Sequence, residues 1–82
     1  MKKTKRVTKS YELPVVIEKD QAGYFFATAP DLQGCYTQGK SLEEALTNIR
    51  EVIELHLADR MALGEQIPRR KIVSLSSLEV TV

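Results

Sequence analysis

The chain alternates apolar and polar residues over residues 11–18, and this period of two predicts a β-strand with one buried face. The apolar positions of that face are Leu13, Val15 and Ile17. Pro14 has no backbone N–H to donate to a ladder, so the strand is expected to lie at an edge of the sheet or to begin near Pro14. A hairpin loop follows, with Asp20 and Gly23 as its turn residues.

Residues 24–29 are predicted to return as a second strand, because they are rich in aromatic residues. Alternation places Tyr24, Phe26 and Thr28 on one face, and Phe25, Ala27 and Ala29 on the other. The two strands together predict an antiparallel hairpin.

A tight turn and a third strand are predicted next. Pro30 fixes its own φ, and the Asp31 carboxylate can accept from backbone amides ahead of it, which suits a turn. Gly34 and Gly39 are expected to take positive φ and to bracket a short strand over residues 35–38. The three strands would form an antiparallel meander.

A long amphipathic helix is predicted over residues 42–63. Ser41 and Glu44 are spaced as a capping box, in which the Ser41 hydroxyl accepts from the Glu44 amide and the Glu44 carboxylate accepts from the Ser41 amide. Gly64 suits the position just after the helix, where a left-handed φ is common. The apolar stripe consists of Leu42, Ala45, Leu46, Ile49, Val52, Ile53, His56 and Leu57.

Two apolar features have no predicted partner within one small sheet. Residues 55–63 make the last turns of the helix apolar nearly all round, which indicates packing on something further, such as a second copy. Residues 72–82 are predicted to form a final strand, with a change of parity at Ser76-Ser77 that requires a bulge, a bend or a crossing between sheets. The last part of this run is suited to pairing across a subunit interface, and its apolar residues are Leu78, Val80 and Val82.

Composition limits the chain of 82 residues to one small domain, expected over residues 11–82. Residues 1–10 are expected to be a flexible basic arm, while the other 72 residues hold seven basic and eleven acidic side chains. The arm is a candidate nucleic-acid contact or a solubilising tail; its basic residues are Lys2, Lys3, Lys5, Arg6 and Lys9. No stretch is apolar enough for a signal peptide or a membrane span, so a cytoplasmic protein is expected.

Residues with catalytic potential are few. Glu18, Asp20 and Asp31 flank the predicted hairpin and are conceivable ligands of a nuclease metal, but we interpret Asp20 and Asp31 as turn residues. We interpret Cys35 as a small buried residue and His56 as a packing residue of the helix. The sequence therefore predicts no catalytic residue, no metal and no cofactor.

Short motifs at fixed spacing resemble the HicB family of antitoxins. The matching segments are residues 23–25, 29–35, 37–39 and 41–45, followed by Asn48, the apolar helix and residues 64–68. The resemblance implies a truncated RNase H-like α+β fold of order β-β-β-α-β, a three-stranded antiparallel sheet with one long helix packed on it plus a C-terminal strand. Pro30, Asp31, Gly34, Gly39, Ser41 and Glu44 match the family pattern and are interpreted as turn and cap residues that determine the fold.

HicB antitoxins bind HicA, a small basic mRNA interferase, and cover its catalytic surface, so the resemblance implies a non-catalytic antitoxin of a type II toxin-antitoxin system. Many members add a C-terminal DNA-binding module, which is not found before Val82, so a short form is expected. A homo-oligomer, either a dimer or a tetramer, is also expected. The alternative is a solitary oligomeric scaffold or regulator that binds nucleic acid through its basic N-terminal arm.

Overall fold

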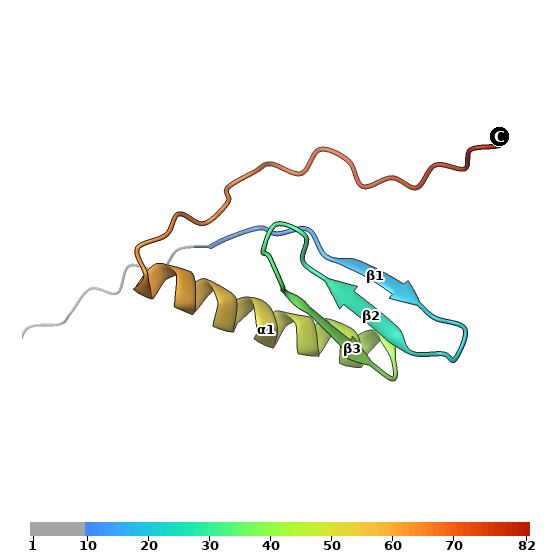
Figure 1. Ribbon diagram of the computed structural model, residues 1–82, viewed down its shortest axis with the longest axis horizontal. Coiled ribbons are helices and arrows are strands. Elements are labelled where there is room, and N and C mark those ends of the chain that lie inside the picture. The colour runs from blue at the N-terminus through green and yellow to red at the C-terminus, as the bar shows by residue number, and fades with distance from the viewer. Residues whose placement is uncertain (1–9) are drawn as a thin grey trace, which may run out of the picture.

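A computed structural model describes residues 10–82, in which three strands precede one long helix (Figure 1). The strands β1 (Val16–Lys19), β2 (Phe25–Thr28) and β3 (Tyr36–Gly39) form one antiparallel sheet in the order β1-β2-β3. The helix α1 (Leu42–Ala62) lies along one face of this sheet and packs mainly on β3 and β2. The predicted α+β order of three strands and a helix is confirmed, while the basic residues at positions 2–9 lie outside the described part.

The first strand begins later than predicted. Residues 11–15 are irregular, and the ladder between β1 and β2 starts at the pair Val16 and Thr28. The Ala29 amide faces β3, because it donates to the Cys35 carbonyl at 2.9 Å. The next pair of the β1–β2 ladder would therefore be Pro14 with Pro30, and neither has an N–H to donate. Leu13 and Val15 nevertheless pack against the core, so the alternation correctly predicted the buried face.

Two consecutive turns join β2 to β3. The Leu32 amide donates to the Ala29 carbonyl at 3.0 Å, and the Cys35 amide donates to the Leu32 carbonyl at 3.2 Å. Pro30 therefore takes the second position of the first turn, which its fixed φ suits, and Gly34 takes the third position of the second turn with φ of 75°. Leu32, between the turns, is buried.

Gly39 does not have the positive φ that was predicted for it. It belongs to β3, is buried, and lies against the start of α1. A Cβ at this position would lie 2.6 Å from the backbone nitrogen of Ala45. Gly39 is therefore needed for the close approach of strand and helix and not for an unusual backbone conformation.

Both ends of α1 follow the sequence signals. Ser41 Oγ accepts from the Glu44 amide at 3.1 Å, the first half of the predicted capping box. The second half is wrong in one detail, because Glu44 Oε1 accepts from the amide of Lys40, at 3.3 Å, and not from that of Ser41. At the other end Leu63 is the C-cap, and Gly64 follows with φ of 73°.

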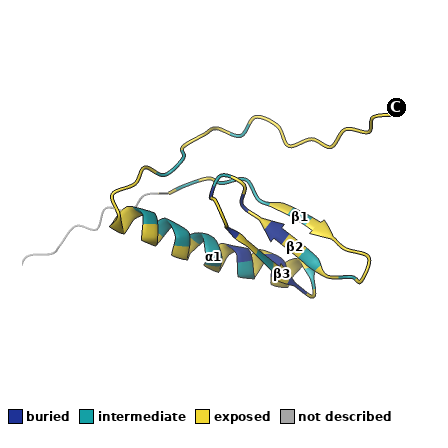
Figure 2. Cartoon of the chain, in the orientation of Figure 1, coloured by how far each residue is buried: buried dark blue, intermediate teal, exposed yellow. Residues whose placement is uncertain are grey.

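The core is small and consists mostly of small side chains. Its fully buried members are Ala27, Ala29, Leu32, Cys35, Ala45 and Ile49. Figure 2 shows these buried residues gathered where the sheet meets the first half of α1. Around them lies a half-buried ring of larger residues, namely Leu13, Val15, Ile17, Phe25, Val52, Ile53 and Leu57. Two members of the predicted helical stripe, Leu42 and Leu46, are exposed, because the narrow sheet does not reach them.

The C-terminal tail, residues 65–82, does not contain the predicted strand in the single chain. It turns back after Gly64 and runs away from the helix (Figure 1). Val73 is 90% exposed and Leu78 is 85% exposed, so the apolar residues of the tail have no partner in the described residues of the chain. A strand needs a neighbour for its backbone groups, and none of the three described strands is paired with the tail.

Candidate protein-protein interface

The face of the sheet that is turned away from α1 is uncovered. Val16, Thr28 and Tyr36 form one cross-strand row on this outer sheet face, and Glu18, Phe26 and Gln38 form the next. Directly opposite residues of antiparallel strands project from the same face, so both rows face solvent together. All six side chains are exposed.

Exposed aromatic side chains make the outer sheet face partly apolar. Tyr36 is 70% exposed and Phe26 is 41% exposed, and Tyr24 extends the surface beyond the end of β2. Large aromatic side chains are enriched at protein-protein interfaces, where they contribute much of the binding energy. The sequence predicted that Tyr24 and Phe26 share a face, but it did not indicate that no segment of residues 10–82 covers this face.

Acidic residues dominate a different surface. The helix α1 exposes five carboxylates, those of Glu43, Glu44, Glu51, Glu54 and Asp59. The first two lie in the first turn, where the positive end of the helix dipole favours them. The exposed aromatic residues of the sheet and the exposed carboxylates of the helix thus lie on different elements.

The start of the C-terminal tail is fixed to the body by two arginines. The Arg70 guanidinium forms an ion pair with the Asp31 carboxylate, and the Arg69 guanidinium lies 4.5 Å from the centroid of the Tyr11 ring. Asp31 therefore binds the tail and not the backbone amides that the sequence analysis assigned to it. Neither contact was predicted, although the run of three basic residues after Pro68 was a signal that could have pointed to them.

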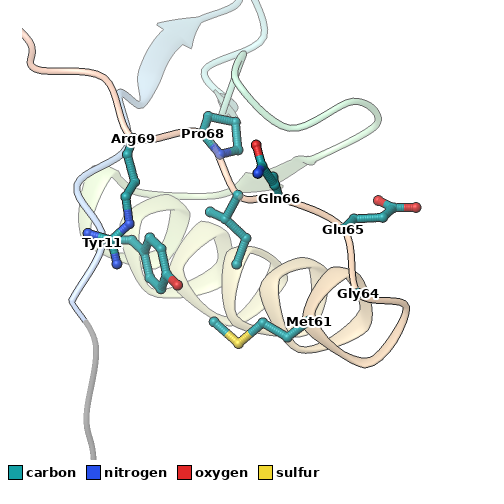
Figure 3. Close-up of a pocket in the computed structure, with 8 residues that line it drawn as sticks. Tyr11, Met61, Gly64, Glu65, Gln66, Pro68 and Arg69 are labelled. Carbon is teal, nitrogen blue, oxygen red and sulfur yellow. The ribbon is translucent and has the colours of Figure 1, made fainter.

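These contacts close a hollow of about 740 Å³ beneath the returning chain (Figure 3). Tyr11 and Met61 face each other across it, and residues 64–69 form its far wall. The hollow contains Glu65 and Arg69 but no cluster of groups with catalytic chemistry. We interpret it as the space left between the end of α1 and the tail.

The residues considered for catalysis lie apart. Glu18 is exposed on the outer sheet face, Asp20 Oδ1 accepts from the Tyr24 amide at 2.8 Å, and Asp31 is paired with Arg70. Within residues 10–82, no group of three or more His, Cys, Asp or Glu side chains is placed to hold a metal ion. His56 is half-buried on α1 and lines a shallow hollow together with Asp59 and Arg60.

Within residues 10–82, no helix is long and apolar enough to cross a membrane.

Cys35 is buried, as predicted, and its thiol is unpaired. Burial raises the pKa of the Cys35 thiol above its ordinary value of 9.0, and the positive charge of Arg60 opposes this rise. This contribution of the neutral thiol to the free energy of unfolding is fully present below the pKa that Cys35 has in the unfolded chain. It is lost as the pH rises through the folded pKa, because there the unfolded chain releases a proton that the folded chain retains.

A pH titration of stability tests this effect. We expect the free energy of unfolding to fall more steeply between about pH 8 and pH 10 for the natural chain than for the variant Cys35→Ala, measured by urea denaturation at each pH. The variant serves as the control because it lacks only the thiol and keeps every other titratable group of the natural chain. Equal slopes for the two proteins would contradict a raised thiol pKa.

Comparison with known proteins identifies the family. A family model described as the HicB-like antitoxin of bacterial toxin-antitoxin systems matches residues 13–80. The chain belongs to the HicB-like antitoxin family. The match includes the outer sheet face of this HicB-like chain and also most of its C-terminal tail.

Relatives and a solved structure agree with this assignment. The chain is similar to the crystal structure of the N-terminal domain of the antitoxin HicB of Burkholderia pseudomallei, with a TM-score of 0.63 and 29% identity, over 71% of this chain and 68% of that one. A UPF0150 protein of Helicobacter pylori is 66% identical over 44 residues, which are 54% of this chain and 60% of that protein. A UPF0150 protein of Thermoplasma acidophilum is 46% identical over 55 residues, 67% of this chain and 80% of that protein. The family thus confirmed implies a toxin partner in general.

Proposed function

We propose that this HicB-like chain is a non-catalytic antitoxin that binds a HicA-like toxin in the cytoplasm and covers its RNA-cleaving surface. Membership of the antitoxin family carries this proposal. The uncovered outer sheet face supports it, because occlusion requires a surface that remains open after the chain has folded. The described side chains offer contact surfaces and no assembled set of catalytic groups, which agrees with action by occlusion.

The outer sheet face is the part of the surface that we assign to the toxin. Phe26 lies in its middle row between Glu18 and Gln38, so an aromatic anchor is flanked by groups that can hydrogen-bond. A central aromatic residue with a polar rim is the arrangement in which interface hot spots occur. The loop residue Asp20 adds a carboxylate at the edge, next to Tyr24.

The acidic side of α1 has a separate role in this proposal. A HicA toxin is basic, and complementary charge accelerates the encounter of two proteins more than it strengthens the final complex. The four exposed glutamates of α1 would therefore raise the association rate. The apolar contact at Phe26 would control the dissociation rate.

Inhibition of RNA cleavage tests the proposal. A purified HicA toxin encoded beside this chain is mixed with increasing amounts of the chain, and cleavage of an RNA substrate is followed. We expect cleavage to stop near equimolar antitoxin. Phe26→Ala is expected to weaken inhibition by about 30-fold or more, because truncation of a hot-spot aromatic typically costs at least 2 kcal/mol of binding free energy.

Leu42→Ala is the matched control, since Leu42 is 45% exposed and Phe26 41% exposed, but Leu42 lies on the helix. The control is expected to inhibit as well as the natural chain. Undiminished cleavage at excess natural chain would contradict the antitoxin function. Equal inhibition by all three proteins would contradict the outer sheet face as the toxin surface.

A further inference from the structure

Within residues 10–82, the backbone groups on the outer edge of β1 have no partner strand. An apolar groove lies beside the segment that leads into β1. The order β1-β2-β3 leaves one side of β1 unpaired, and α1 packs mainly on the other two strands. A groove of about 670 Å³ therefore remains between the segment leading into β1 and the exposed flank of α1. Its apolar lining includes Leu13, Val15, Leu46, Ile53 and Leu57.

The C-terminal tail has the complementary pattern. Leu78, Val80 and Val82 alternate with Glu79 and Thr81, so a strand over these residues would present three apolar side chains on one face. A strand of five residues is about 17 Å long. The groove follows α1 from Leu46 to Leu57, about 16 Å at 1.5 Å per residue. The strand and the groove therefore match in length and in polarity.

We infer that the tail strand of one copy adds to the β1 edge of a second copy and places Leu78, Val80 and Val82 in its groove, with the exchange made in both directions. Each chain carries one such strand and one such groove. A two-fold exchange therefore fills both grooves and both β1 edges, so this contact closes at two copies. This assembly does not require the toxin binding proposed above.

The tail does not use the groove of its own chain. Arg69 holds its start beside Tyr11, and Arg70 pairs with Asp31. Tyr11 also lines the groove, so the groove of the same chain lies near the start of the tail. Beyond Ile72 the tail is nevertheless exposed along its whole length. The hydroxyls of Ser74 and Ser76 lie 2.7 Å apart, just before the apolar parity changes. This is the place where a tail that crosses between copies would change direction.

The exposed area of the chain is large enough for such an interface. The single chain has an accessible surface of 7469 Å². A compact monomer of 9.3 kDa is expected to have about 5000 Å². If residues 1–9 are allowed the full surface of an unfolded chain, roughly 1600 Å², the remaining excess is still about 900 Å². A standard interface removes about 800 Å² from each partner, so the excess is sufficient for a dimer.

Exposed apolar residues at the end of α1 also favour association with a second copy of the chain. Leu55, Met61 and Leu63 are exposed on the last turns of the helix, outside the groove. A tail folded back on its own β1 edge would leave this surface uncovered. A whole second subunit provides surface beyond the exchanged strand, and that surface can cover the helix end.

Sedimentation analysis of the full chain tests the exchange. We expect the natural chain to be a dimer. Val80→Asp is expected to raise the dimer dissociation constant by about 100-fold or more, since each exchanged strand would bury an unpaired carboxylate. Thr81→Asp is the matched control. It adds the same charge one position later on the other face of the strand, and a change of less than about 3-fold is expected.

Disulfide trapping identifies the occupant of the groove. The variants Leu46→Cys and Val80→Cys are made separately in a Cys35→Ala background, mixed and oxidised. We expect a covalent dimer from the mixture, and a chain that carries both substitutions should also crosslink between molecules. A monomeric natural chain, equal losses in the two Asp variants, or a crosslink formed only within one molecule would each overturn the inference. In the last case the tail would occupy its own groove.

Discussion

Replacing Ile49 with alanine is expected to destabilise the fold by about 2–5 kcal/mol, the range measured for large-to-small substitutions in protein cores. Ile49 is the largest aliphatic side chain that α1 contributes to the buried core, where Ala27, Ala29 and Ala45 are its small neighbours. Small neighbours on a sheet and a helix cannot collapse into the space that the substitution leaves. A domain of this size has little stability in reserve, so Ile49→Ala is expected to be largely unfolded at 37 °C.

Urea denaturation followed by circular dichroism at one fixed protein concentration measures this effect, because association would make stability depend on concentration. Leu42→Ala, on the same helix but exposed, is the control and is expected to lose less than about 1 kcal/mol. If the two variants lost the same amount, the hydrophobic core would not be centred on Ile49.

Gly39→Ala is expected to destabilise the chain by about 1–3 kcal/mol through overpacking. The new Cβ would lie 2.6 Å from the backbone nitrogen of Ala45 and 3.0 Å from its Cα, so the start of α1 would have to move away from β3. Backbone atoms cannot rotate out of the way as the end of a flexible side chain can. The capping bond between Ser41 and Glu44 would be disturbed with it.

Gly34 is the matched control, because glycine is needed there for the backbone conformation and not for lack of space. Gly34 has φ of 75°, and a Cβ there would meet nothing within 4 Å. Asn tolerates left-handed φ better than Ala, so Gly34→Asn is expected to be more stable than Gly34→Ala. At position 39 the larger side chain makes the overlap worse, so Gly39→Asn is expected to be no more stable than Gly39→Ala. The same order of stability at both positions would contradict this distinction.

The two glycines also show what the sequence could and could not reveal. A turn preceded by Pro30 and Asp31 predicts that Gly34 takes positive φ, because turn chemistry is local. Position 39 needs glycine because the start of α1, three residues later, packs closely against it. The spacing of residues in the sequence does not reveal how closely the strand and the helix approach each other. Helix ends were predicted well for the same reason, since Ser41 and Gly64 act through bonds to near neighbours.

The sequence predicted the helix and strands better than it predicted which surfaces remain exposed. Alternation in residues 24–29 divides them between two faces, but only the arrangement of the three strands and the helix shows that the face with Phe26 is left open. The pairing of Arg70 with Asp31 joins residues 39 positions apart, and the basic run after Pro68 indicates an ionic contact but does not identify its partner. The strand predicted over residues 72–82 does not form in the single chain, and the proposed exchange between copies would supply its neighbour.

The alanines of the core have a practical consequence for protein engineering. Ala27, Ala29 and Ala45 leave no room for larger side chains in the middle of the molecule, so attempts to raise its melting temperature by enlarging central residues should fail. Gains should come from the periphery, where Val15 and Val52 are only half-buried, so that a larger aliphatic side chain can extend toward solvent. A library that varies only these outer positions would concentrate its diversity where the architecture tolerates it.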